Sequence, residues 1–140
     1  MRSPGFTLLE TLVVLLIVAL AATALPRLGS AGQGGLARAA AHDVAASLRD
    51  ARHAARAAGM ETRVVFDTGR GTVLGVRGPA RALPSGARLA VEGAAAEADA
   101  DGRIAVRFDA EGGSTGGRVT IALGTQVAVV EVDWMTGHVR

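Results

Sequence analysis

The sequence contains no cysteine, no tyrosine and no lysine, and it has only three phenylalanines and one tryptophan among its 140 residues. The absence of cysteine excludes disulfide bonds, thiol catalysis and zinc sites with cysteine ligands. Hydrophobic residues make up 49% of the chain, but many are alanine, so the few large side chains can fill only a small, thin core. The length leaves room for one small domain and an appendage.

Because lysine is absent, all 15 basic residues are arginine, and 13 acidic residues bring the net charge to +2. The arginines alternate with aspartate and glutamate along the chain, so no block of like charge indicates a nucleic-acid-binding tail. We expect a solvated, arginine-rich surface, and DNA is not an expected partner.

The longest apolar stretch runs from Phe6 to Leu25 and is interrupted only by Glu10 and three threonines. Twenty helical residues span about 30 Å, the thickness of the hydrocarbon core of a bilayer. Arg2 precedes the stretch, which predicts a cytoplasmic N-terminus and an exported C-terminal part. The stretch is longer than the apolar region of about 7–15 residues in a cleaved secretory signal. An ordinary single-span anchor gives no reason for a carboxylate at this depth.

The residues Gly5-Phe6-Thr7-Leu8-Leu9-Glu10, with the aliphatic run after them, resemble the class III signal of type IV pilins and type II secretion pseudopilins. The resemblance implies that residues 1–5 are a leader peptide, which a prepilin peptidase removes by cleavage after Gly5. The same enzyme then methylates the new N-terminus, Phe6, to N-methylphenylalanine. Residues 6–25 become a transmembrane helix and later a filament-core helix.

The resemblance also implies a role for Glu10 in assembly, where its carboxylate pairs with the terminal amine of a neighbouring subunit. This role agrees with the physical rule that a buried charge is tolerated when it is paired and hydrogen-bonded, and costly when it is not.

Residues 26–59 are expected to continue the N-terminal helix into the periplasm, after an interruption. Pro26 and the glycines that follow it predict a kink and a loosened stretch, with regular helix from about Leu36. Gly59 is placed as the C-terminal cap. An apolar stripe at helical spacing is predicted to face a sheet: Leu36, Ala40, Val44, Leu48, Ala51, Ala55 and Ala58.

Residues 60–140 have the pattern of short β-strands and turns. The segment 92–102 has no periodicity and is predicted to be a mobile loop, and Trp134 is predicted to be a large core or interface residue. Strands are predicted over residues 62–67, 72–77, 88–91, 104–108, 118–123 and 126–132. One helix followed by these strands predicts an α+β fold, in which a small antiparallel β-sheet head packs on the helix.

Three segments between Ala51 and Gly137 resemble the GspH/FimT family of minor pseudopilins and pilins. They are the helix end Ala51–Gly59 with the strand after it, the glycine-rich loop Phe108–Gly117, and the ending Val132–Gly137. The resemblance implies a pilin-like fold, with the long N-terminal helix running into the head. The loop and the ending favour a GspH-type pseudopilin of type II secretion over a pilus protein.

The family resemblance implies a structural minor pseudopilin of the type II secretion system. Such a chain is a single-pass protein of the bacterial inner membrane with a periplasmic C-terminal domain, and it later joins a periplasmic pseudopilus. The expected partners are other major and minor pseudopilins, the prepilin peptidase, the inner-membrane assembly platform and, before assembly, membrane lipid. A FimT-like minor type IV pilin, acting in pilus assembly or DNA uptake, remains the alternative.

No catalytic or metal-binding constellation is recognised in the sequence, so we expect neither enzymatic activity nor a cofactor. Residues 112–116 fit the letters of a nucleophile elbow, but the residues after them predict a strand where that motif requires a helix. His42 and His53 do not have the spacing of a metal-ligand pair and are interpreted as solvated. Four acidic residues lack the spacing of a calcium-binding loop and are interpreted as turn residues: Asp67, Asp109, Glu111 and Asp133.

Overall fold

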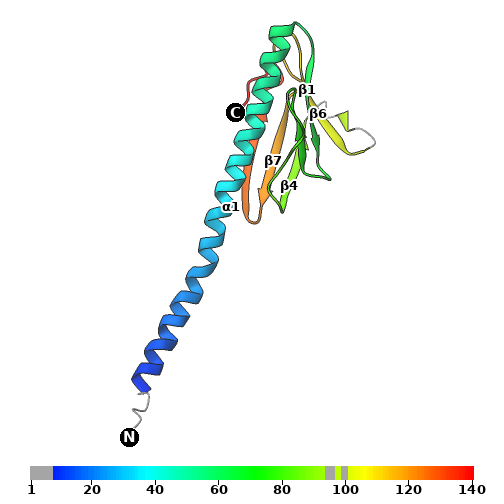
Figure 1. Cartoon of the computed structure of the whole chain (residues 1–140). Coiled ribbons are helices and arrows are strands. Elements are labelled where there is room, and N and C mark those ends of the chain that lie inside the picture. The colour runs from blue at the N-terminus through cyan, green and yellow to red at the C-terminus, as the bar shows by residue number, and fades with distance from the viewer. Residues whose placement is uncertain (1–7, 94–96, 99–100) are drawn as a thin grey trace.

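A computed structural model describes residues 8–93, 97–98 and 101–140, and it describes only the backbone of residues 22–31 and 97–98. One long helix, α1 (Leu8–Ala58), projects as a stem from a head made of β-strands (Figure 1). The described strands are β1 (Thr62–Asp67), β2 (Thr72–Leu74), β3 (Arg81–Ala82), β4 (Ala87–Glu92), β5 (Glu97–Ala98), β6 (Arg103–Phe108), β7 (Gly117–Leu123) and β8 (Gln126–Val132). The architecture is α+β and pilin-like, as predicted.

Helix α1 runs without interruption from Leu8 to Ala58, so the predicted break between Pro26 and Leu36 is wrong. Proline removes one backbone hydrogen bond, and glycine costs about 1 kcal/mol relative to alanine, but neither residue excludes helical dihedral angles. Long runs of alanine and leucine on both sides favour the helix strongly enough to carry it across this stretch.

The end of α1 is capped as predicted. Gly59 adopts a positive φ of 62°, and the Met60 N–H donates to the Ala55 carbonyl at 3.2 Å, which is the pattern of a Schellman cap. Arg56 lies in the last turn, where a cation complements the helix dipole.

The described residues of the head form two antiparallel sheets instead of the one that we predicted. The first has the strand order β3-β2-β1-β6-β5, and the second has the order β4-β7-β8. Both predicted hairpins are present, with Asp67 opposite Thr72 in one and Leu123 opposite Gln126 in the other. Among the described strands, the chain passes to the second sheet for β4, returns to the first for β5 and β6, and passes to the second again for β7 and β8.

The segment 92–102, predicted to be a mobile loop, contains the end of one strand and the whole of another. Strand β4 extends to Glu92, and Glu97 and Ala98 form β5, where they pair with Ala105 and Ile104 of β6. Residues 94–96 and 99–100 of this segment lie outside the described residues.

The core lies between α1 and the two sheets, and both sheets contact the helix. Its largest fully buried side chains are Phe66, Phe108, Leu48 and Ile121. The predicted helix stripe is correct from Ala40 to Ala55, but Leu36 is 52% exposed and Ala58 is also exposed. Because two sheets flank the helix, the buried face is wider than predicted, and it also includes Ala37, Ala41 and Ala45.

Trp134 does not belong to the core, because 66% of its surface is exposed. Strand β8 ends at Val132, so the alternation that buries Val130 and Val132 does not reach the tryptophan. A role for Trp134 in an interface stays a prediction.

The three segments that resemble the GspH/FimT family meet near the end of α1, and we call this region the distal junction. Arg52 Nε donates to the Gly112 carbonyl at 3.2 Å, and Arg56 donates to the Glu111 carbonyl at 3.0 Å. The loop is joined to the C-terminal turn, because the Ser114 N–H donates to the Trp134 carbonyl at 3.0 Å. A Cβ atom on Gly112, where φ is 93°, would overlap the Arg56 guanidinium, so the junction requires glycine there.

Asp133 holds the C-terminal turn of the distal junction. One carboxylate oxygen, Oδ1, accepts hydrogen bonds from the Thr136 N–H at 2.8 Å, the Thr136 hydroxyl at 2.9 Å and the Met135 N–H at 3.1 Å. The hydrogen bond from the Thr136 N–H is the main reason that the pKa of Asp133 lies below its ordinary value of 3.8.

Asp67 and Asp109 hold turns in the same way. Asp67 accepts from the Arg70 N–H at 2.8 Å, which is the largest cause lowering the pKa of Asp67, and Asp109 accepts from the Gly113 N–H at 2.7 Å. Glu111 also lies in a turn. The interpretation of these acidic side chains as turn residues is therefore confirmed.

We predict that Leu48→Ala lowers the free energy of unfolding of the head by about 2–5 kcal/mol, because Leu48 is fully buried and its truncation leaves a cavity. Leu74→Ala is the matched control, since Leu74 is 43% exposed, and its expected cost is less than about 1 kcal/mol. Denaturant unfolding of the full chain in detergent, followed by circular dichroism, measures both. Equal losses of unfolding free energy in the two variants would contradict the placement of Leu48 in the core.

Asp133→Ala is predicted to lower the melting temperature in a pH-dependent manner. The folded pKa lies below 3.8, so the ionised group contributes stability above that value, and this contribution is lost as the pH falls through the folded pKa. The difference in melting temperature between the native chain and the variant should therefore be largest near neutral pH and shrink below about pH 4. Asp50→Ala, which removes an exposed carboxylate from α1, controls for net charge. A difference that stays constant across this range contradicts the role of the carboxylate.

Candidate assembly surface

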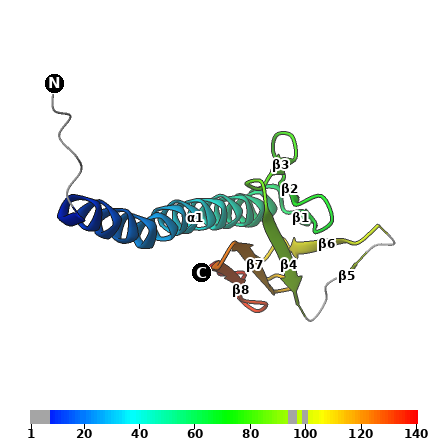
Figure 2. The same ribbon diagram turned by 90° about the horizontal axis from the view of Figure 1, so that it is seen from below.

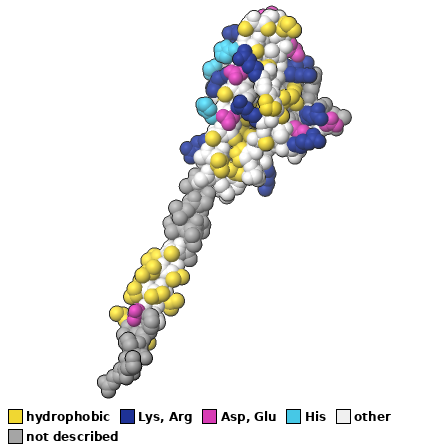
Figure 3. Space-filling view, in the orientation of Figure 1, with side chains coloured by type: hydrophobic (Ala, Val, Ile, Leu, Met, Phe, Trp, Pro, Cys, Tyr) yellow, Lys and Arg dark blue, Asp and Glu magenta, His cyan; other side chains and the backbone are white. Residues whose placement is uncertain are grey.

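The first part of α1, residues 8–21, presents an apolar surface that the described head does not cover. Ten large aliphatic side chains are exposed there, from 44% at Val13 to 82% at Leu8. Figure 3 shows hydrophobic side chains along this part of the helix. We call it the stem surface, and its residues are Leu8, Leu9, Leu12, Val13, Val14, Leu15, Leu16, Ile17, Val18 and Leu20. A helix that is apolar all round is typical of one surrounded by lipid or by other helices.

Glu10 lies in the first turn of α1, exposed among these aliphatic side chains. A carboxylate at this place is favoured by the positive end of the helix dipole. Thr11, the next residue, donates its hydroxyl to the Leu8 carbonyl at 2.9 Å, so its polar group is satisfied within the helix. Anything that covers the stem surface also takes the Glu10 carboxylate out of water, where a charge is tolerated only when it is paired and hydrogen-bonded.

The predicted cleavage site, Gly5, and the predicted methylation site, Phe6, lie outside the described residues. Among the residues that the structure describes, no helix is both long and apolar enough to cross a membrane.

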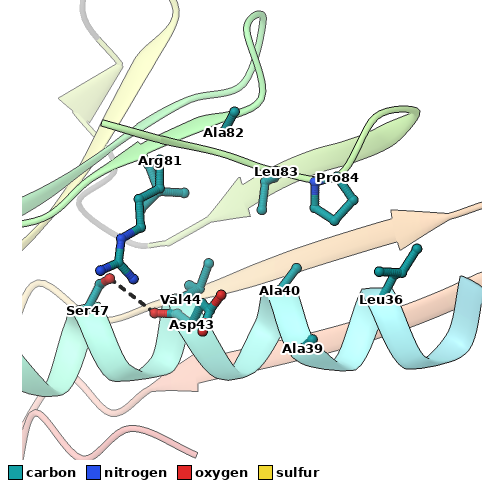
Figure 4. Close-up of a pocket in the computed structure, with 11 residues that line it drawn as sticks. Leu36, Ala39, Ala40, Asp43, Val44, Ser47, Arg81, Ala82, Leu83 and Pro84 are labelled. Atoms are coloured by element: carbon teal, nitrogen blue, oxygen red, sulfur yellow. Dashed lines mark hydrogen bonds between the residues drawn. The ribbon is translucent and has the colours of Figure 1, made fainter. Parts of the chain in front are cut away.

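A groove with a volume of about 570 Å³ lies beside α1 in the head. One wall is the helix itself, and the other is the segment that contains β3 (Figure 4). The lining residues are mostly small or apolar: Leu36, Ala39, Ala40, Val44, Val73, Ala82, Leu83 and Pro84, with Asp43, Ser47 and Arg81. The sequence did not predict this groove, because residues about 40 positions apart form its two walls. A pair of apolar residues, Leu83 and Pro84, in a segment otherwise typical of irregular chain, was the only local sign of an apolar wall.

In the described structure, the side chains considered for catalysis and metal binding either make other hydrogen bonds or lie exposed. The loop before β7 leads into a strand and not a helix, so a nucleophile elbow is excluded there, and Ser114 Oγ accepts from the Gly116 N–H at 3.0 Å. His42 and His53 are exposed, as predicted. Within the described ranges, no three His, Cys, Asp or Glu residues are grouped so that they could hold a metal ion.

Two family models match the chain, and they cover its two functional parts. The prokaryotic N-terminal methylation motif matches residues 1–26, which include Gly5, Phe6 and Glu10. The type II transport protein GspH matches residues 40–137, which include the described head and the distal junction. No curated protein and no solved structure gave a significant match. Because the second match spans more than half of the chain, this protein belongs to the GspH family of type II transport proteins and is a GspH-type pseudopilin.

Proposed function

We propose that this protein is a structural minor pseudopilin, which assembles through its stem surface into the periplasmic pseudopilus that drives protein export across the outer membrane. The observation that carries the proposal is the arrangement of ten exposed aliphatic side chains around Glu10, within the segment that matches the methylation motif. A monomer in water would not leave such a surface bare, because apolar area on this scale marks an interface with protein or membrane.

The stem surface is proposed to have two successive environments. The precursor is held in the inner membrane with its head in the periplasm, and the peptidase cleaves it after Gly5 and methylates Phe6. The same aliphatic side chains then pack against the stems of other pseudopilins. Lipid tails and aliphatic side chains are similarly apolar, so this transfer has little hydrophobic driving force of its own.

Glu10 is proposed to give the assembled state its specificity. Two opposite charges at contact distance attract strongly where water is excluded, so the carboxylate favours the one position in which it meets the terminal amine of a neighbour. The register of the stems follows from this pair, whereas the aliphatic side chains fit many registers.

The head is proposed to act as a contact surface for other subunits and for the assembly platform, and not as an enzyme. The charged side chains of the distal junction that have described partners are engaged in holding the fold, as with Arg52, Arg56 and Asp133. The work of extending the filament must then come from a partner that hydrolyses a nucleotide.

We predict that Glu10→Ala leaves cleavage and methylation intact but reduces incorporation into filaments at least tenfold. The reason is that a buried ammonium left without its partner costs about 3–5 kcal/mol. Subunits in sheared filaments and in membranes, quantified by immunoblotting, give the incorporated fraction. Thr11→Ala is the matched control in the same helical turn, and it should assemble normally because the Thr11 hydroxyl bonds only within the helix in the described structure.

Mass spectrometry of the mature N-terminus separates processing from assembly in the same strains. The expected chain begins at a methylated Phe6, and Gly5→Ala should abolish the cleavage. Normal incorporation of Glu10→Ala would contradict the pairing role, whereas an uncleaved native chain would contradict the whole proposal.

Deletion of the gene is predicted to abolish the release of secreted enzymes while twitching motility and DNA uptake remain normal. Secretion should be restored by the native gene and not by the Gly5→Ala gene. Loss of piliation or DNA uptake with normal secretion would instead support a minor type IV pilin.

A further inference from the structure

The groove beside α1 is apolar at the end that faces the stem and polar at its other end. Leu36 and Ala40 on the helix lie opposite Pro84 and Leu83, whereas Ser47 and Arg81 lie at the end farther from the stem (Figure 4). A ligand that fits this gradient is apolar and enters along α1 from the stem side. An apolar ligand at the polar end would bury charged groups and leave them unpaired.

Among the described residues, α1 is open at the edge of the groove that faces the stem. A Cβ atom built on Gly32 or on Gly35 would meet no atom within 4 Å outside the nearby backbone of the helix, and Leu36 at the edge of the groove is 52% exposed. Small residues allow a second helix to come close to the axis of the first. A neighbouring helix can therefore lie along this part of α1 and continue into the groove.

A stem surface like that of this chain matches the groove in chemistry. The stem surface of this chain presents leucine, valine and isoleucine side chains on every side, and such a surface needs apolar cover once it leaves the membrane. The groove and the stem surface are also parts of the same helix, so a subunit that packs along one stem is already directed toward the groove.

The distance between the two surfaces determines when they can meet. Ala40, in the middle of the groove, and Leu15, in the middle of the stem surface, are separated by 25 positions of continuous helix, which is roughly 38 Å along the axis. Two subunits that stand at the same depth in one membrane cannot bring the stem of one to the groove of the other. They can do so only when one subunit is displaced outward by this distance.

We propose that the groove binds the stem surface of an adjacent pseudopilin displaced outward by roughly 38 Å, and that this contact forms in the filament but not in the membrane. The proposal rests on the proposed function, and it adds the partner segment and the stagger. The contact joins two different surfaces of the subunits, so it is heterologous and extends a helical assembly instead of closing a dimer.

The test uses the full chain in secreting cells, with the photo-crosslinking residue p-benzoylphenylalanine at Leu36 on the edge of the groove. After irradiation, mass spectrometry should map the adducts to residues 8–21 of a pseudopilin, and only in cells that assemble filaments. The same probe at Leu74, which is 43% exposed on β2 and does not line the groove, should give no stem adducts.

A probe at Leu16 in the stem surface reports assembly independently of the groove. Stem adducts from Leu16 without stem adducts from Leu36 would overturn the groove proposal and leave the proposed function standing. Adducts from Leu36 that map to head residues or to a secreted protein, or that form equally in cells blocked before assembly, would also overturn it. Absence of adducts from both positions would overturn the proposed function together with the groove.

Substitution of the same two positions gives a quantitative comparison. Leu36→Glu places a charge in the apolar end of the groove and should reduce incorporation into filaments at least about tenfold, whereas Leu74→Glu should change it less than about twofold. Equal incorporation of the two variants would contradict the proposed contact, provided that both heads unfold at the same denaturant concentration.

Discussion

The fold depends on the close packing of alanine side chains of α1 against two β-sheets. Alanine lets the sheets approach the helix axis, but each one buries little area, so most of the large buried side chains come from the sheets. Phe66 and Phe108, on neighbouring strands of the first sheet, are two of them. Arg52 and Arg56, near the end of α1, donate hydrogen bonds to loop carbonyls and so join the helix end to the loop. Figure 2 shows the result, with the strands grouped around one end of the helix and the rest of it bare.

Local pattern predicted the elements of the head well but not their arrangement. Strand β1 has the predicted bounds, and both hairpins follow from turn residues placed between alternating runs. The division into two sheets depends on which distant strands pair, as β1 does with β6 and β4 does with β7, and no local signal specifies such pairs. Proline and glycine predicted a break in α1 that the structure does not have. The free-energy cost of these residues in a helix is small compared with the stabilisation by the helix-forming residues around them.

The features of the candidate assembly surface also differ in how far the sequence predicted them. Glu10 was evident from the sequence, because a carboxylate within an aliphatic run is conspicuous without a structure. The groove was not, since Leu36 was assigned to the core stripe. Only the structure shows that Ala37 is buried and that Leu36 lines a groove together with Leu83. The three segments that resemble the GspH/FimT family have a structural role in the distal junction: they connect loop, turn and helix, and their glycines leave room for arginine.

The continuity of α1 has a mechanical consequence. Fifty-one residues in one helix form a rod of about 77 Å, with hydrogen bonds along its axis and the head packed against it from Ala37 onward. Such a rod transmits an axial thrust from its base to its tip without folding or unfolding any part of the head. A rotation imposed at the base turns the head by the same angle, so the angle of the stem about its own axis sets which way each face of the head points.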